Sequence, residues 1–147
     1  MSNERKFAER LTEFMILGSL NATQLSEKTG ISRSAISGLL RQEHLPSTKA
    51  LTAFADYFHC TTDYLLGLTD DYQDGIHAVK SELSFGKIFK KLLKETKTTQ
   101  YFLTKHEKIS GNLIYKWLND QAEPSVYNLM KLSRAMNVSV DCLLGRE

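Results

Sequence analysis

Apolar side chains recur at helical spacing near the start of the chain, at Phe7, Leu11, Phe14 and Met15. Positions i, i+4, i+7 and i+8 lie on one face of an α-helix. The same spacing returns in the second half of the chain, at Phe85, Phe89, Leu92 and Leu93. Long stretches in which apolar and polar residues alternate, as they do in half-buried strands, are absent. The sequence therefore predicts an all-α protein.

The two halves also match over a longer stretch. At an offset of 78 residues, segment 7–67 aligns with segment 85–145 without a gap and with 13 identities in 61 pairs. The identities fall at apolar, helix-capping and Pro/Gly positions, and the D-x-L-L-G endings agree best. A gapless repeat at such positions indicates that one structural unit has been duplicated.

The length of 147 residues suits two small helical domains. We expect the first domain in residues 1–69 and the second in residues 84–147. Residues 70–83 form the expected linker, whose polar, glycine-containing core is typical of a loop. The slightly longer segment from Leu68 to Leu83 reaches about 50 Å when fully extended. A helical linker that holds the two units rigidly is the alternative.

Each repeat divides into five short helices. In the first repeat, Asn21 is a suitable N-cap and has Gln24 three residues later, a variant of the capping box. Gly30 then suits a left-handed turn, and Ser32 suits the cap of a third helix. The second repeat has Lys108 in place of that glycine, at some conformational cost. A fourth helix follows each Pro-Ser pair, and the last helix ends at a glycine.

The third helix of each repeat has an apolar and a polar face. We expect the inward side chains to be Ala35, Ile36, Leu39 and Leu40, then Leu113, Ile114, Trp117 and Leu118. The outward ones are Arg33, Ser34, Ser37, Gly38 and Arg41, then Gly111, Asn112, Tyr115, Lys116 and Asn119. Phe54, Phe58 and Trp117 are expected in the core rather than as stacking platforms for bases. Two short helices joined by a tight turn, the second with a polar outer face, are typical of helix-turn-helix units that enter the DNA major groove.

The outward residues have the chemistry that such a role needs. Arg33 and Arg41 can contact guanine edges or phosphates, and Asn112 can pair with adenine. Lys105, Lys108 and Lys116 can contact phosphates. The stretch 28–42 holds three basic and no acidic residues. Net charge is a weaker indicator: it is +2 for the chain, with 7 basic against 9 acidic residues in 1–73 and 12 against 8 in 74–147.

The segments LSEKTGISRSAISGLL, LPSTKALTAFADYF and TTDYLLG resemble the repressor/Cro (XRE-type) helix-turn-helix family, and so does YKWLNDQAEPSVYNLMKLSRAMNVSVDCLLG. This resemblance implies two tandem five-helix, lambda-repressor-type domains. It also implies a transcriptional regulator, a repressor, whose partner is double-stranded operator DNA. Members of the family mostly act as dimers.

The resemblance, together with the pattern, selects the expected DNA-binding residues. A glutamine early in the second helix supports a phosphate contact in the family. Gln100 fits that position, whereas the first repeat has Ala22 there and offers Thr23 or Gln24 instead. The full expected set is Thr23, Gln24, Ser32, Arg33, Ser34, Ser37, Arg41, Gln100, Ser110, Asn112, Tyr115, Lys116 and Asn119.

Other classes of protein fit the sequence poorly. Phosphate-loop, nucleophile and paired-carboxylate motifs are missing, so we expect neither an enzyme nor a cofactor or small-molecule ligand. The four histidines lack metal-binding spacing, and Cys60 and Cys142 are expected to be reduced thiols. Without a signal-peptide pattern or an apolar run of membrane length, a cytoplasmic location away from membranes is expected.

Two alternatives stay open at the level of sequence. One or both helix-turn-helix units can bind a protein, such as another regulator or a toxin. Tyr115 is bulkier than Ser37 at the same position, which indicates either a different base preference or a surface for protein contact. The chain can also engage DNA in two ways. One chain can read two non-identical half-sites, or it can form a homodimer through one repeat.

Overall fold

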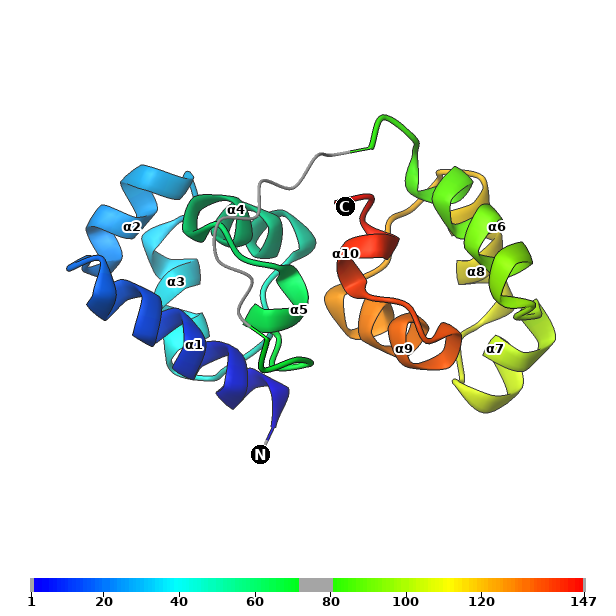
Figure 1. Cartoon of the computed structure of the whole chain (residues 1–147), viewed down its shortest axis with the longest axis horizontal. Helices are drawn as coiled ribbons and strands as arrows, with labels where there is room; N and C mark the ends of the chain where they lie inside the picture. The colour runs from blue at the N-terminus through cyan, green and yellow to red at the C-terminus, as the bar shows by residue number, and fades with distance from the viewer. Residues whose placement is uncertain (1, 72–80, 147) are drawn as a thin grey trace. The chain divides into compact units, whose positions relative to one another are not determined.

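The computed structural model describes residues 2–71 and 81–146, and these residues contain ten helices and no strand (Figure 1). The prediction of an all-α protein is confirmed for this part of the chain. The chain separates into two compact units, Met1–Ala78 and Val79–Glu147. The alternatives for the linker fall mostly on residues 72–80, outside the described residues.

The first unit consists of α1 (Asn3–Leu17), α2 (Ala22–Thr29), α3 (Arg33–Leu40), α4 (Thr48–Phe58) and α5 (Thr62–Leu65). Helices α1 and α2 pack against α3, and α5 packs against α1 and α4. Phe7 of α1 and Phe54 of α4 are fully buried, with ring centroids 6.2 Å apart. The apolar stripe of the first helix therefore builds the core, as its spacing predicts.

The second unit has the same order of helices, α6 (Phe85–Thr96), α7 (Gln100–His106), α8 (Gly111–Leu118), α9 (Val126–Met136) and α10 (Val140–Leu143). Helices α6 and α7 pack against α8, and α10 packs against α6 and α9. Trp117 is the largest fully buried side chain. Its ring makes T-shaped contacts with the rings of Phe85 and Phe89, with ring centroids 6.4 and 6.0 Å apart. The expectation that Trp117 belongs to the core is confirmed.

Helix caps lie where the sequence predicts them. Asn21 Oδ1 accepts a hydrogen bond from the Gln24 backbone N–H at 2.8 Å, and Gln24 Oε1 accepts one from the Asn21 N–H at 2.9 Å. Ser32 and Ser110 cap α3 and α8. The serine of each Pro-Ser pair caps the fourth helix of its unit. These bonds satisfy N–H groups that have no partner within the helix.

Residues with a positive φ lie at matching positions in the two units. In the first unit a positive φ occurs at Ser19, Gly30, Gln42, His59 and Gly67. In the second it occurs 78 residues later, at Lys97, Lys108, Asp120, Asn137 and Gly145. Lys108 thus takes the left-handed conformation that Gly30 takes in the first turn, with φ of 60° against 77°. The predicted non-glycine turn is confirmed.

Three side-chain predictions need correction. Gly38, expected outward, is buried because the chain turns back after α3 and lays Glu43 and His44 over it. Leu113, expected inward, is 36% exposed because it lies about 100° around the helix from buried Ile114, at the edge of the apolar stripe. Phe58 is only half-buried and stacks on Phe14, with ring centroids 4.7 Å apart.

In the second unit, the Asp120 carboxylate connects the end of α8 to the start of α6. Asp120, just after α8, accepts hydrogen bonds from the Ser84 hydroxyl at 2.9 Å and from the Gly86 N–H at 2.8 Å. A Cβ on Gly86 would lie 2.8 Å from this carboxylate and from the carbonyl oxygens of Trp117 and Leu118. Glycine at position 86 therefore permits the close approach of α6 to the end of α8.

Candidate nucleic-acid interface

The first unit presents polar side chains along α3 and at the start of α2. Arg33, Ser34 and Arg41 are exposed, and Ser37 is half-buried. Thr23 and Gln24 are exposed on α2, which packs directly against α3. Helix α3 thus keeps its apolar side against α1 and α2, and its polar side chains remain accessible.

Two of the expected contact residues in this unit have structural tasks as well. Ser32 Oγ accepts a hydrogen bond from the Ala35 N–H at 3.2 Å, which fixes the start of α3. Gln24 uses its side-chain carbonyl for the capping box with Asn21, so its amide N–H₂ group is the part that can donate to a phosphate. The side chain of Thr23 does not take part in the capping box.

Arg41 lies just beyond α3 and is paired with Glu43, a residue that the sequence patterns do not single out. Arg41 Nε lies 3.1 Å from Glu43 Oε1, and Arg41 Nη2 lies 3.3 Å from Glu43 Oε2. The hydrogen bonds and the charge of Glu43 raise the pKa of Arg41 above its ordinary value. The same contacts with Arg41 hold the pKa of Glu43 below its ordinary value, with a smaller contribution from His44. One of the two expected arginine readers is therefore not an isolated charge.

In the second unit the expected contact residues are again accessible. Gln100, Ser110, Asn112, Tyr115 and Asn119 are exposed, and Lys116 is half-buried. Ser110 Oγ caps α8 by accepting from the Leu113 N–H at 3.1 Å. Asn119 donates from Nδ2 to the Tyr115 carbonyl at 2.9 Å, which engages its amide in ending the helix. Asn112 and Tyr115 thus remain the main candidates for base contacts on α8.

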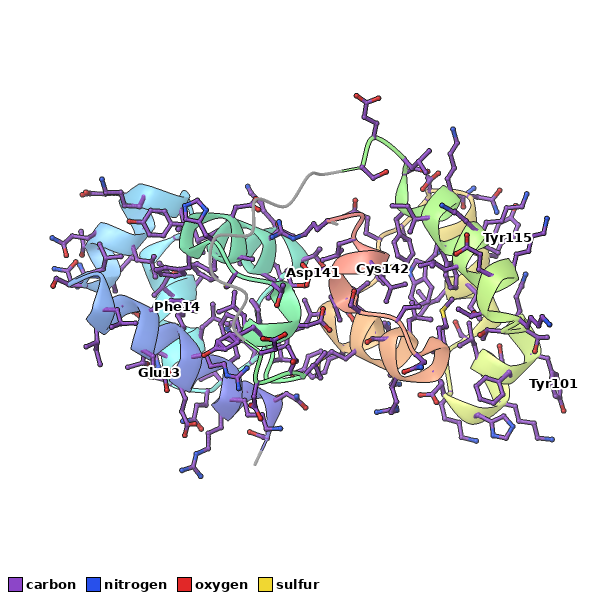
Figure 2. All side chains as sticks on the ribbon, viewed as in Figure 1. Glu13, Phe14, Tyr101, Tyr115, Asp141 and Cys142 are labelled. Carbon is purple, nitrogen blue, oxygen red and sulfur yellow. The ribbon has the colours of Figure 1, made fainter. Side chains whose placement is uncertain are left out.

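This surface also carries more aromatic residues than the first unit has on α2 and α3. Tyr101 and Phe102 of α7 are 69% and 37% exposed, and Tyr115 of α8 is 56% exposed. Tyr101 and Tyr115 project from the second unit in Figure 2. Lys105 donates to the Tyr101 hydroxyl at 3.1 Å. An apolar and cationic surface of this kind suits a partner that is anionic and also offers flat or apolar groups.

A cleft of about 490 Å³ lies between α6, the start of α7 and the end of α8. Most of the residues that line it are polar or basic, namely Lys90, Lys94, Thr98, Thr99, Gln100 and Asn119. Leu93 and Leu118 complete the lining. The cleft brings the predicted residues Gln100 and Asn119 together with two lysines that the sequence patterns do not single out.

The first unit differs at the positions that match these lysines. Thr12 stands where Lys90 is and donates to the Ala8 carbonyl at 2.7 Å. Ile16 stands where Lys94 is and is 71% exposed. The sequence shows that α6 is rich in lysine. It does not show that two of these lysines lie beside the start of α7, because that depends on how the helices pack. The second unit therefore concentrates positive charge at a position where the first unit is neutral.

The described residues meet the requirements of neither a three-ligand metal site nor a membrane-spanning helix. No group of three His, Cys, Asp or Glu side chains there could hold a metal ion. Among the same residues, no helix has the length and apolar character needed to span a membrane. Neither cysteine forms a disulfide, and Cys60 is buried while Cys142 is half-buried.

Comparisons with known proteins agree with the geometry of the first unit. Residues 10–71 match the Cro/C1-type HTH DNA-binding domain. A 65-residue stretch of the chain is 34% identical to the "Uncharacterized HTH-type transcriptional regulator YobD" of Bacillus subtilis (strain 168). That match covers 44% of this chain and 58% of the relative, so it spans less than two thirds of that protein. No solved structure matches the chain significantly.

Proposed function

We propose that this protein is a sequence-specific transcriptional regulator, acting in the cytoplasm as a repressor of the genes whose operators it occupies. Its two helix-turn-helix domains are residues 1–69 and 84–147, joined by the linker 70–83. The Cro/C1-type match over residues 10–71 supports DNA binding by the first domain, and the similarity to an HTH-type regulator supports a regulatory role.

The observation that carries the proposal is the accessible polar face of α3 within that matching segment. Arg33 and Arg41 bring guanidinium groups to this face, and Ser34 and Ser37 are small enough for close approach to base edges. Helix α2 packs against α3, and its exposed Thr23 and Gln24 can donate to the phosphate backbone. Helix α3 reads the bases, and α2 fixes its position on the duplex.

The proposal that the second unit is a further reader rests on the repeated backbone. Helices α8 and α9 lie 78 residues after α3 and α4 at both ends. The positive-φ positions of the described residues pair off between the units with the same offset. Exposed Asn112 and Tyr115 then occupy the base-reading positions, and the lysine-lined cleft accepts a backbone phosphate. A chain with two readers can recognise two non-identical half-sites without a second copy.

Selection of bound sequences from a random duplex pool tests this function directly. Wild-type protein should enrich one site, and its length and symmetry report how many units engage. Arg33→Ala and Lys116→Ala should each weaken binding to that site, because each removes one DNA-binding side chain from one unit. If Lys116→Ala leaves affinity and footprint unchanged, the second unit is not a reader. If wild-type protein enriches no sequence, the proposed function is wrong.

A second function, binding of a protein by the second unit, is favoured by the exposed aromatic residues. Tyr101 and Phe102 lie outside the base-reading helix, so a DNA contact from α8 alone does not account for their exposure. A salt titration separates the two functions, since release of counterions from phosphates gives a steep linear fall of log affinity with log salt concentration. If substitutions in the second unit leave the slope of log affinity against log salt concentration unchanged, that unit does not neutralise phosphates, which would favour the protein partner.

A further inference from the structure

We propose that Glu43 positions Arg41 to read a guanine base instead of a phosphate, so that the pair sets specificity at the end of α3. This inference rests on the proposed DNA-binding function and names a residue that this function does not require. Glu43 is not itself a base reader, because it acts through the guanidinium that it holds.

The geometry of the pair fixes which edge of Arg41 faces outward. Glu43 accepts hydrogen bonds from Nε and Nη2, the side edge of the guanidinium, at 3.1 and 3.3 Å. The end edge carries N–H groups of Nη1 and Nη2 that point in parallel. This edge has the donor spacing that matches the N7 and O6 acceptors of guanine. Because Glu43 occupies the side edge, the end edge of Arg41, which can bind guanine, is the one available to a partner.

The negative charge of Glu43 disfavours contact between Arg41 and a phosphate. A carboxylate at 3.1 Å offsets the positive charge of Arg41 and repels a phosphate that approaches the same place. A guanine edge carries no net charge, so this repulsion is much weaker for a base. Arg41 thus gains selectivity for a base at the expense of general attraction to the DNA backbone.

Gly38 provides the space in which Glu43 sits. The Glu43 N–H donates to the Gly38 carbonyl at 3.1 Å, so the turn after α3 folds back onto the helix. An added Cβ at position 38 would lie 3.3 Å from Glu43 Oε2 and 3.0 Å from His44 Nε2. The absence of a side chain in the middle of α3 therefore permits the carboxylate to lie over the helix beside Arg41.

The second unit lacks this arrangement. Asn119, Gln121 and Lys116 stand at the positions of Arg41, Glu43 and Gly38. None of the three can reproduce a carboxylate–guanidinium pair seated on a glycine. The guanine-selecting pair is therefore a property of the first unit alone, and the two units should differ in the bases they prefer.

The test uses the full chain and the duplex that wild-type protein selects. The guanine read by Arg41 is the one whose preference disappears from the pool selected by Arg41→Ala. Replacing that guanine by 7-deazaguanine, which lacks the N7 acceptor, should weaken wild-type binding about tenfold. In Glu43→Gln the same replacement should cost less than about threefold, while affinity for random duplex rises because a negative charge is removed.

Two further variants make the result specific. Glu27→Gln removes an exposed carboxylate from α2, so it should raise affinity for random duplex and keep the tenfold 7-deazaguanine effect. Gly38→Ala should reduce the 7-deazaguanine effect less than Glu43→Gln does, because its methyl would lie 3.0 Å from His44 Nε2 and 3.3 Å from Glu43 Oε2 and so shifts both side chains by only a few tenths of an ångström. An equal 7-deazaguanine effect in wild type and Glu43→Gln, or a selected site without an Arg41-dependent guanine, overturns the inference and leaves DNA binding intact. Failure of wild-type protein to select any duplex overturns both.

Discussion

Gly30 and Lys108 occupy the same left-handed backbone position in the two turns that precede α3 and α8, with φ of 77° and 60°. A Cβ makes this conformation unfavourable for lysine but not for glycine. The second unit therefore carries strain in its turn that the first unit avoids. The relationship predicts stability changes of opposite sign for substitutions at the two positions.

Lys108→Gly should stabilise the second unit by about 0.5–1 kcal/mol, because it relieves the left-handed strain. Gly30→Ala should destabilise the first unit by a similar amount, about 1 kcal/mol. A Cβ at position 30 would meet nothing within 4 Å, so only the backbone conformation contributes there. Urea denaturation of each variant measures both changes, and a lower stability of Lys108→Gly would contradict the assignment.

Gly86→Ala should destabilise the second unit by about 1–3 kcal/mol, because the new methyl overlaps the Asp120 carboxylate and two carbonyl oxygens at 2.8 Å. Gly111→Ala is the matched control, since a Cβ at that exposed first residue of α8 would meet nothing within 4 Å. It should change stability by less than about 0.5 kcal/mol. Thermal denaturation of the two variants compares them, and equal stabilities would show that the α6–α8 approach tolerates a side chain.

The lysines of the cleft should contribute to DNA affinity without regard to sequence. Lys90→Gln combined with Lys94→Gln should weaken binding to selected and random duplexes alike. It should also make the slope of log affinity against log salt shallower by about 1 for each phosphate that the variant no longer neutralises. Fluorescence anisotropy over a range of salt concentrations measures both quantities.

Lys91→Gln is the control for those lysines, because Lys91 lies on the same helix, outside the lining of the cleft, and pairs with Glu95 at 3.9 Å. It removes one positive charge, half of what the double variant removes, and should leave the salt slope nearly unchanged. If Lys91→Gln flattens the slope by half as much as the double variant does, the effect comes from net charge and the cleft is not a phosphate site.

The pairing of Glu43 with Arg41 should be visible in a pH titration. Because these contacts lower the pKa of Glu43 in the folded protein, its stabilising contribution is present above the ordinary carboxyl pKa. The contribution disappears only as the pH falls through the lowered value. Side-chain carboxyl ¹³C shifts should give Glu43 a midpoint below the ordinary value, and Arg41→Gln should raise it. An unchanged midpoint in Arg41→Gln would show that the pair does not form in solution.

The local sequence was sufficient to predict the helices and their ends. The 3.6-residue periodicity defines the apolar stripes, and side-chain oxygens of Asn21, Ser32 and Ser110 reach backbone N–H groups only three residues away. The left-handed turn at Gly30 and its counterpart at Lys108 were also predicted from short segments, whereas the other positive-φ residues that are not glycine were not. Such short-range features need no knowledge of how the helices pack.

The tertiary structure decided which side chains meet across helices and turns. The burial of Gly38 and the pairing of Arg41 with Glu43 depend on how the chain turns back after α3, and helical periodicity does not extend past Leu40. The cleft depends on α6 lying beside the start of α7 and the end of α8. The sequence by itself thus determined an all-α fold with a polar third helix in each repeat. Packing decided which charges those helices hold in place, because ion pairs and clefts depend on distances between segments that no local pattern encodes.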